Sequence, residues 1–348
     1  MRNTNKFLGL IFLAVMLFSC TQEEKELKVL QMNIWQEGTM IEGGFEAIVN
    51  EVAFHKPDIV LFSEVRNYNE VDFVSRITDS LRQKGINYYA QSDQSIDVAM
   101  LSLYPISAQT VVGRDIHPNA GVLKTTINME GRTIVAYSAH LDYKNYACYL
   151  PRGYSGVTWE KLEAPITYSK EVEDANSLSL RDEAIRGVIA DAQKEPEERI
   201  VILGGDFNEP SHLDWTEETK NLYDHNGTVV KWQSSVLLAE NGFIDSYRSI
   251  YPNPVTHPGF TFPSDNKDTE IKRLTWAPTA DERDRIDYIY YRPNKNLTLK
   301  EAAIFGPVGD IIKSERVPSK SEDCFIEPQD IWPTDHKATI SVFSVKMK

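Results

Sequence analysis

Residues 200–208 read IVILGGDFN: four aliphatic residues, two glycines, then an aspartate and an asparagine separated by a phenylalanine. A continuous apolar run of this length predicts a short buried strand, which we place at residues 199–204. Asp206 and Asn208 then stand just past its end. Taken alone, the glycines and polar residues indicate only a tight turn. Active-site residues also concentrate on loops held at strand ends by a rigid scaffold, so the segment is a candidate site as well.

Several other predicted strands carry polar residues at their ends that suit a metal better than an ordinary turn. These are Asn33 in the strand at 28–35, Glu64 after 59–62, His140 and Asp142 at the end of 133–140, Asp287 within 286–291, and Asp335 and His336 before 338–345. Each has an ordinary interpretation as a turn residue, a salt-bridged carboxylate or a structural histidine. Asp287 is harder to dismiss, because a charge inside an apolar strand needs a partner. His336 is available as that partner.

Strand-like runs alternate with helical patterns from Leu27 to the C-terminus, with no linker or repeat. Further strands are predicted at 97–103, 109–113 and 122–128, and helices at 45–54, 68–84 and 177–193. Residues 142–175 form a long irregular segment rich in Tyr, Pro and Gly, and a loop of this length usually has a function. We therefore expect an α/β fold, a four-layered α-β-β-α sandwich of two packed mixed sheets flanked by helices.

The composition is that of a globular protein. The chain has 348 residues, of which 41% are hydrophobic and 25% charged, with a formal net charge of −14. These values exclude a mostly disordered or collagen-like chain. The acidic balance argues against a broad basic surface for nucleic acid. It does not exclude an anionic substrate, because a bound cation can dominate the local charge.

The first twenty residues have the pattern of an export signal. Arg2 and Lys6 precede an apolar run at 7–18, which is too short to cross a bilayer as a helix. We interpret residues 1–19 as a signal peptide. The ending Leu17–Phe18–Ser19–Cys20 resembles a bacterial lipobox and predicts a lipoprotein with lipid on Cys20; the alternative is a plain secretory signal. We expect an exported protein anchored by lipid to the cell envelope, periplasmic or on the cell surface.

The rest of the chain is predicted to consist of a tether and one domain. Residues 20–26 are predicted to be an acidic tether, and residues 27–348 a single folded domain. The two cysteines of this domain, Cys148 and Cys324, could form a disulfide in an oxidising compartment, and the sequence leaves that pairing open.

Taken together, the polar segments resemble the endonuclease/exonuclease/phosphatase superfamily, which has the deoxyribonuclease I-like fold. The resemblance rests on the ordered series Gln31–Trp35, Ser63–Val65, Val98–Ser102, Ser138–Asp142, Gly205–Asn208, Arg285–Ile289 and Thr334–His336. It covers nearly the whole chain from Leu27 onward and implies that residues 27–348 are a catalytic domain of this type. Leu103–Tyr104–Pro105 departs from it, because many members have Arg before Tyr–Pro.

The resemblance implies a metal-dependent phosphoric ester hydrolase. A phosphoester is negatively charged and repels hydroxide, so hydrolysis needs a cation on the phosphoryl oxygens and a positioned water. By resemblance, the principal metal ligand is Glu64, with Asn33 as a nearby ligand or orienting group. Asp335 completes the metal site or the water network, and the ion is Mg²⁺, with Mn²⁺ as an alternative. The implied catalytic residues are Asp206 and Asn208 at the attacking water or phosphate, His336 held by Asp287, and His140 as a donor to a phosphoryl oxygen.

The fold alone does not decide the substrate. The aromatic residues of segment 142–175 could stack on a ring of the substrate, or equally pack the loop onto the scaffold. We expect substrate contacts from Asp142, Tyr143, Arg152 and Trp276. The leading hypothesis is a monomeric phosphodiesterase or phosphomonoesterase acting on small or lipid-linked phosphates. The alternatives are a secreted nuclease of DNA or RNA, and a non-catalytic binding module on the same fold.

Overall fold

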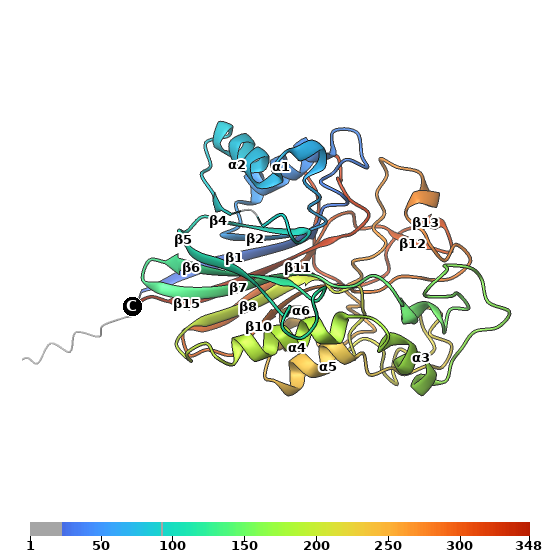
Figure 1. The fold of residues 1–348 in the computed structure, drawn as a ribbon. Helices are drawn as coiled ribbons and strands as arrows, with labels where there is room; N and C mark the ends of the chain where they lie inside the picture. The colour runs from blue at the N-terminus through green and yellow to red at the C-terminus, as the bar shows by residue number, and fades with distance from the viewer. Residues whose placement is uncertain (1–22, 92) are drawn as a thin grey trace, which may run out of the picture.

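The computed structural model describes residues 23–91 and 93–348 and shows two sheets packed face to face (Figure 1). The first sheet has the strand order β14-β11-β15-β1-β2-β4-β3, with bounds β14 (Phe325–Ile326), β11 (Leu297–Phe305), β15 (Ala338–Lys346), β1 (Glu24–Asn33), β2 (Ile59–Ser63), β4 (Val98–Ser102) and β3 (Tyr89–Ala90). The second has the order β5-β6-β7-β8-β10-β9, with bounds β5 (Ile106–Val112), β6 (Val122–Met129), β7 (Arg132–His140), β8 (Ile200–Asp206), β10 (Asp287–Tyr291) and β9 (Ile244–Asp245). Both sheets mix parallel and antiparallel pairs, as in β1–β2 and β1–β15.

Helices cover the two outer faces. In Figure 1, α1 and α2 lie above the first sheet, and α4 and α5 lie below the second. The bounds of the helices are α1 (Gly44–His55), α2 (Phe73–Gln83), α3 (Ser169–Asn176), α4 (Arg181–Ala192), α5 (Gln233–Glu240) and α6 (Ser246–Ile250). A small pair, β12 (Asp310–Ile312) and β13 (Glu315–Val317), lies among the loops. The predicted four-layered sandwich is confirmed.

β8 shows how the sequence produces this layering. Ile200 and Ile202 belong to the core between the two sheets, whereas Val201 and Leu203 belong to the core under α4 and α5. Successive side chains of a strand point to opposite faces, so a strand covered on both faces must be apolar throughout. The uninterrupted IVIL run therefore follows from the position of β8 between a sheet and a helical layer.

The predicted helices need correction at their ends. The segment predicted as one helix at 68–84 is a short 3₁₀ turn followed by α2, because Asp72 caps α2 by accepting a hydrogen bond from the Ser75 amide at 2.9 Å. Likewise, α4 begins at Arg181 rather than at 177. The segment expected to be irregular contains α3.

Strand β11 was not predicted. Its middle carries Lys300 and Glu301, and its register with β15 shifts between Leu299 and Glu301. An irregularity of this kind breaks the alternation of apolar and polar residues by which a strand is recognised.

The acidic tether is also shorter than predicted. β1 begins at Glu24 rather than after residue 26, because it extends its ladder with β15 to the pair Glu24–Lys346. The Glu24 carboxylate accepts a hydrogen bond from the Ser344 hydroxyl at 2.6 Å. The predicted signal peptide and Cys20 lie outside the described residues.

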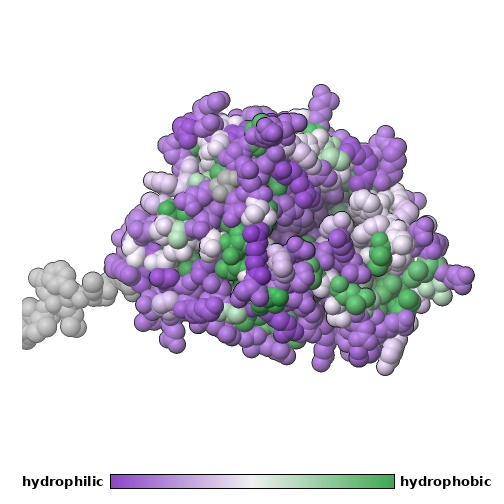
Figure 2. All heavy atoms as spheres, in the orientation of Figure 1, coloured by the Kyte–Doolittle hydropathy of each residue, from purple (hydrophilic) through white to green (hydrophobic). Residues whose placement is uncertain are grey.

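Two further observations concern cysteines and membrane spans. Cys148 is buried, Cys324 is exposed, and both are free, so the open question of a disulfide is answered in the negative. Among residues 23–91 and 93–348, no helix has both the length and the apolar character needed to span a membrane. Figure 2 shows a largely hydrophilic face, with hydrophobic residues gathered toward the right, over the loops at that side of Figure 1.

Candidate active site

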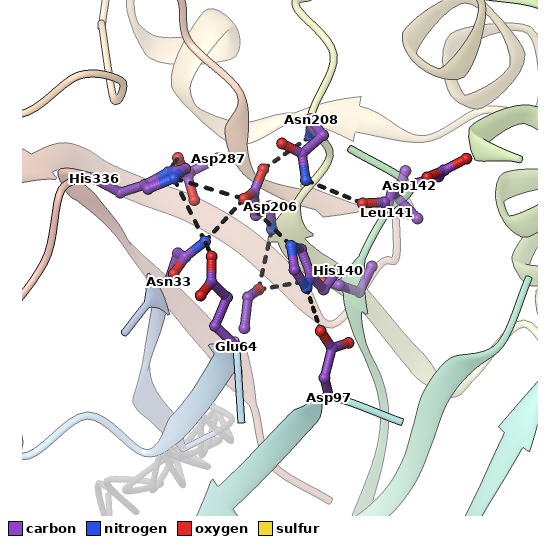
Figure 3. Close-up of polar contacts among 12 residues, drawn as sticks. Asn33, Glu64, Asp97, His140, Leu141, Asp142, Asp206, Asn208, Asp287 and His336 are labelled. Atoms are coloured by element: carbon purple, nitrogen blue, oxygen red, sulfur yellow. Dashed lines mark hydrogen bonds and ion pairs between the residues drawn. The ribbon is translucent and has the colours of Figure 1, made fainter. Parts of the chain in front are cut away.

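The polar residues predicted at strand ends converge on one edge of the two packed sheets. Asn33 ends β1, Glu64 follows β2, and His140 and Asp206 end β7 and β8. β10 runs antiparallel to β8 and pairs Asp287 with Asp206. In Figure 3 these side chains point toward a common centre. One cluster thus collects groups from both sheets.

The second glycine of the GGDFN segment is required by the packing of the strands. A Cβ atom on Gly205 would lie 2.0 Å from the carbonyl oxygen of Ala139 in β7, which runs parallel to β8. No side chain fits at that distance. The glycine therefore lets β8 approach β7 closely enough to hold Asp206 beside His140.

His336 is held by the buried carboxylate that the sequence suggested as its partner. Its Nδ1 lies 2.8 Å from Oδ2 of Asp287 (Figure 3). Gln31 Nε2 donates to the other carboxylate oxygen at 3.0 Å. Burial opposes charge on the imidazole, but Asp287 and Asp206 outweigh it and raise the pKa of His336 well above its usual value. The ring is therefore fixed and protonated at neutral pH.

His140 has the same arrangement with a different carboxylate. Its Nδ1 lies 2.8 Å from Oδ2 of Asp97, and its Nε2 lies 3.8 Å from Oδ2 of Asp206. Burial again opposes charge, and the neighbouring carboxylates, Asp97 above all, raise the pKa of His140 to about 9. His336 Nε2 is also 3.8 Å from Oδ2 of Asp206. Two imidazolium groups thus flank one carboxylate.

Asp206 lies at the centre and is almost completely buried. Its Oδ1 accepts a hydrogen bond from the Asn208 amide at 2.8 Å, and its Oδ2 accepts one from Asn33 Nδ2 at 3.0 Å. Burial raises the pKa of Asp206 to about 6, although His336 and His140 act in the opposite direction. A carboxylate with this pKa is ionised at neutral pH and can accept a proton.

The carboxylates Glu64, Asp206 and Asp335 line one recess, and carboxylates are the ligand type that a hard cation prefers. Burial raises the pKa of Asp335 to about 7, with Glu64 and Asp206 adding to the increase. Carboxylates crowded in this way are stabilised by a divalent cation, and oxygen ligands are those that Mg²⁺ prefers. The residues present therefore fit a bound divalent metal, with Glu64 as the first candidate to hold it.

Asn33 has the contacts of an orienting group, one of the two roles that the resemblance implies. Its Nδ2 faces Glu64 Oε1 at 3.2 Å and Asp206, while its Oδ1 accepts a hydrogen bond from the Trp35 amide at 2.9 Å. An amide nitrogen does not ligate a cation, so in this arrangement Asn33 orients the two carboxylates. Asp206, Asp287 and His336 also lie close enough to surround an ion, but His336 and Asp287 are already bonded to each other.

Beside the cluster lies a recess of about 410 Å³ with a largely aromatic wall. Tyr143 and Trp276, two of the four predicted substrate contacts, line it. Asn208 lines it too, with its Nδ2 donating to the Leu141 carbonyl at 3.0 Å.

The other two predicted substrate contacts, Arg152 and Asp142, are corrected by the structure. The Arg152 guanidinium has no exposed surface and forms a salt bridge with buried Asp284. Both carboxylate oxygens of Asp142 accept backbone hydrogen bonds, from Lys144 at 3.1 Å and Leu180 at 3.2 Å, and Figure 3 shows its side chain turned away from the cluster. Arg152 is therefore structural, and Asp142 caps the loop, as one interpretation of the sequence allowed.

Three residues of the cluster were missed by sequence reasoning. Asp97 holds His140, Gln31 holds Asp287, and the Ser63 hydroxyl accepts a hydrogen bond from the Asp206 amide at 3.3 Å. Asp97 directly precedes β4, so the rule that marks polar residues next to buried strands could have found it. Gln31 and Ser63 lie inside strands, where neither spacing nor composition distinguishes them.

The chain resembles known proteins in sequence along nearly its whole length. A family model described as the Endonuclease/Exonuclease/phosphatase family matches residues 30–336. The chain is 25% identical over 348 residues to the uncharacterized protein F14F9.5 of Caenorhabditis elegans, covering 96% of this chain and 98% of that protein.

Solved structures share the fold at low sequence identity. The structure of D. rerio TDP2 complexed with single strand DNA product is 15% identical, has a TM-score of 0.51, and covers 91% of this chain and 98% of its own. An endonuclease/exonuclease/phosphatase from Bacteroides vulgatus is 13% identical with a TM-score of 0.50, over 92% of this chain and 99% of its own. At these identities the likeness extends to the fold.

Proposed function

The chain belongs to the endonuclease/exonuclease/phosphatase family, and we propose that it is an exported, Mg²⁺-dependent phosphodiester hydrolase. Members of this family are generally hydrolases of phosphoesters that use divalent metals. The observation that carries the proposal is the placement of His336 and His140 on two sides of Asp206, each with Nε2 at 3.8 Å from the same carboxylate oxygen. Two fixed cations around one proton acceptor suit attack by water on an anionic centre.

The residues divide the chemistry among them. Asp206 orients the attacking water and accepts its proton. His140 and His336 donate hydrogen bonds to the phosphoryl oxygens, where negative charge grows in the transition state. Glu64, with Asp206 or Asp335, would hold a divalent metal, which would supply further neutralisation of that charge. Asp97 and Asp287 keep the two imidazoles protonated and correctly turned.

The shape of the surface supports a diester over a monoester. A second recess of about 450 Å³ adjoins the first, and the two share Arg66 and His140. The second recess is polar and is lined by Asn67, Ser95 and Arg114. A phosphate bound at His140 therefore has space for one ester group in each of the two recesses.

We expect metal removal and loss of Glu64 to abolish turnover. With bis-p-nitrophenyl phosphate and Mg²⁺, EDTA should lower the rate by about three orders of magnitude, because the cation contributes several kcal/mol to the transition state. Glu64→Gln should lower the rate and move half-maximal activity to higher Mg²⁺ concentration, as measured by metal titration. Glu163→Gln, the same change on an exposed loop, is the control. Full activity in EDTA, or an unaltered metal titration for Glu64→Gln, would contradict the assignment.

We propose in addition that the protein is lipid-anchored through Cys20, on the strength of the basic start, the short apolar run and the lipobox-like ending of residues 1–20. The full-length chain should incorporate labelled palmitate and fractionate with membranes. Cys20→Ala should abolish both, and Cys324→Ser, which alters an exposed cysteine of the folded domain, should leave both unchanged. Release of an unlabelled, soluble wild-type protein would instead indicate a plain secretory signal.

A further inference from the structure

The aromatic wall of the 410 Å³ recess is rigidly built. Tyr154 and Lys161 form a bridge that closes a tight loop, and the Tyr146 amide donates to the Gly156 carbonyl at 2.8 Å. A Cβ atom on Gly156 would lie 2.3 Å from the Tyr146 carbonyl oxygen, so this loop can pack against the Tyr146 backbone only with glycine. The loop places Trp159 against Tyr149, with ring centroids 5.6 Å apart.

The opposite side of the wall is fixed by one buried carboxylate. Glu282 Oε2 accepts the backbone amides of Trp276 at 3.0 Å and Ala277 at 3.1 Å, and also the hydroxyl of Tyr149. Trp276 packs on Trp159 with ring centroids 5.8 Å apart. Even so, 52% of Trp276 and 56% of Tyr143 remain exposed at the mouth. A large ring that is held in place but left open to water, as Trp276 is, is typical of a binding surface.

Backbone strain is concentrated in the same recess. Five of its lining residues, none of them glycine, adopt left-handed backbone angles: Trp35, Gln36, Glu64, Trp159 and Asn208. For a bulky residue such as Trp159, with φ of 64°, this conformation is uncommon and persists only where surrounding contacts impose it. The surrounding contacts thus hold these residues in backbone conformations that they seldom adopt, as expected for a binding site.

The charged and polar residues of the wall indicate which kind of ligand fits the recess. Its charged members are Glu64, Arg66, His140, Asp206 and Asp335, all in or beside the catalytic cluster. The aromatic part has neither a cation for a second phosphate nor a carboxylate for an amine among the described residues. The Tyr146 hydroxyl is buried beside the Cys148 thiol and is not open to a ligand. A flat, uncharged ring matches these features.

We propose that this recess binds the base of a nucleoside phosphodiester, stacked on Trp276, Trp159 and Tyr143. The inference rests on the proposed function, because the cluster must hold the phosphate. The base could belong to a small nucleotide or to the end of a single strand. The small nucleotide is favoured, since the aromatic part of the recess has no cations for the further phosphates of a strand.

The test compares two ligands that differ only in the base. Adenosine 5′-monophosphate should bind the wild-type protein about ten- to one-hundred-fold more tightly than ribose 5-phosphate in isothermal titration calorimetry with Ca²⁺, as expected for stacking of one base. Trp276→Ala should remove most of that difference and leave ribose 5-phosphate affinity unchanged. Tyr168→Ala, which alters a 70% exposed tyrosine of the same segment outside the recess, is the matched control.

Equal or absent binding of the two ligands, or equal loss of both in Trp276→Ala, would overturn the inference. If bis-p-nitrophenyl phosphate is still hydrolysed with Mg²⁺, that result leaves the proposed function standing. If no phosphoester is hydrolysed but the base preference is found, the proposed function fails and the base site remains. A dinucleotide and a single-stranded ten-mer separate the two sources: equal affinity supports the small nucleotide, and much tighter binding of the ten-mer identifies a strand end.

Discussion

Replacing His336 with alanine should lower phosphodiester turnover by about two to four orders of magnitude, the usual contribution of a positioned protonated group. The imidazole is buried, bonded to Asp287 at 2.8 Å and within 3.8 Å of Asp206. His140 Nε2 lies at the same distance from the same Asp206 carboxylate oxygen. Steady-state kinetics with bis-p-nitrophenyl phosphate measures the effect, and a circular dichroism melt establishes that the variant is folded. His257→Ala, a histidine stacked on Tyr251 outside the cluster, should keep wild-type turnover.

The role of Asp287 gives the same prediction a pH dependence. The Asp287 carboxylate raises the pKa of His336, so the protonated ring survives to a higher pH than a free histidine. Asp287→Asn removes that effect and lowers the pKa. Activity that needs the protonated ring should then decline at a lower pH than in the wild type. An unaltered pH profile, or wild-type turnover in His336→Ala, would show that this pair only supports the structure.

Replacing Arg152 with alanine should destabilise the fold by about 3–5 kcal/mol, the typical cost of removing one partner of a buried ion pair. Its guanidinium donates to Asp284 and to the Arg283 carbonyl, at 3.0 Å for the latter. Asp284 also accepts the Trp215 indole at 3.0 Å. The substitution would leave a fully buried carboxylate without its cation. Urea unfolding followed by fluorescence measures the loss.

Two variants test the cause of that loss. Arg82→Ala breaks an exposed i,i+3 pair with Asp79 and should cost less than about 1 kcal/mol. The double variant Arg152→Met with Asp284→Asn removes both charges and should recover much of the stability lost in Arg152→Ala. If Arg152→Ala unfolds at the same urea concentration as the wild type, the Arg152–Asp284 ion pair makes no net contribution to the free energy of unfolding.

The fold could be predicted because it is encoded in local patterns. The IVIL run of β8 is apolar throughout since both faces are covered, and Asp206 follows it at the strand end. The same rule found Glu64, His140 and His336. The rule failed for β11, because the shift in its register arises only from its pairing with β15.

The roles of individual polar residues were less predictable, because they depend on which partner lies across the fold. Arg152 and Asp284 are 132 positions apart in the sequence, and nothing near Arg152 shows that its charge is already neutralised. Asp97 and Gln31 act by holding another side chain, so their chemistry is visible only with the geometry. The aromatic residues of segment 142–175 divide in the same way. Tyr149 supports the wall by bonding Glu282, whereas Tyr143 is free at the mouth.

The pairing of the first and last long strands places the start of β1 far from the catalytic cluster. β1 starts at Glu24 beside the end of β15 and runs ten residues, about 33 Å, to Asn33 in the catalytic cluster. In Figure 1 the C-terminus and the start of β1 lie at the left, and the loops around the strand ends lie at the right. If Cys20 carries a lipid, as proposed, the bilayer would lie at the end of the molecule where β1 starts. The opening of the recess beside the catalytic cluster would then face away from the bilayer. Such an orientation suits capture of dissolved molecules arriving from the surroundings rather than headgroups of the membrane beneath.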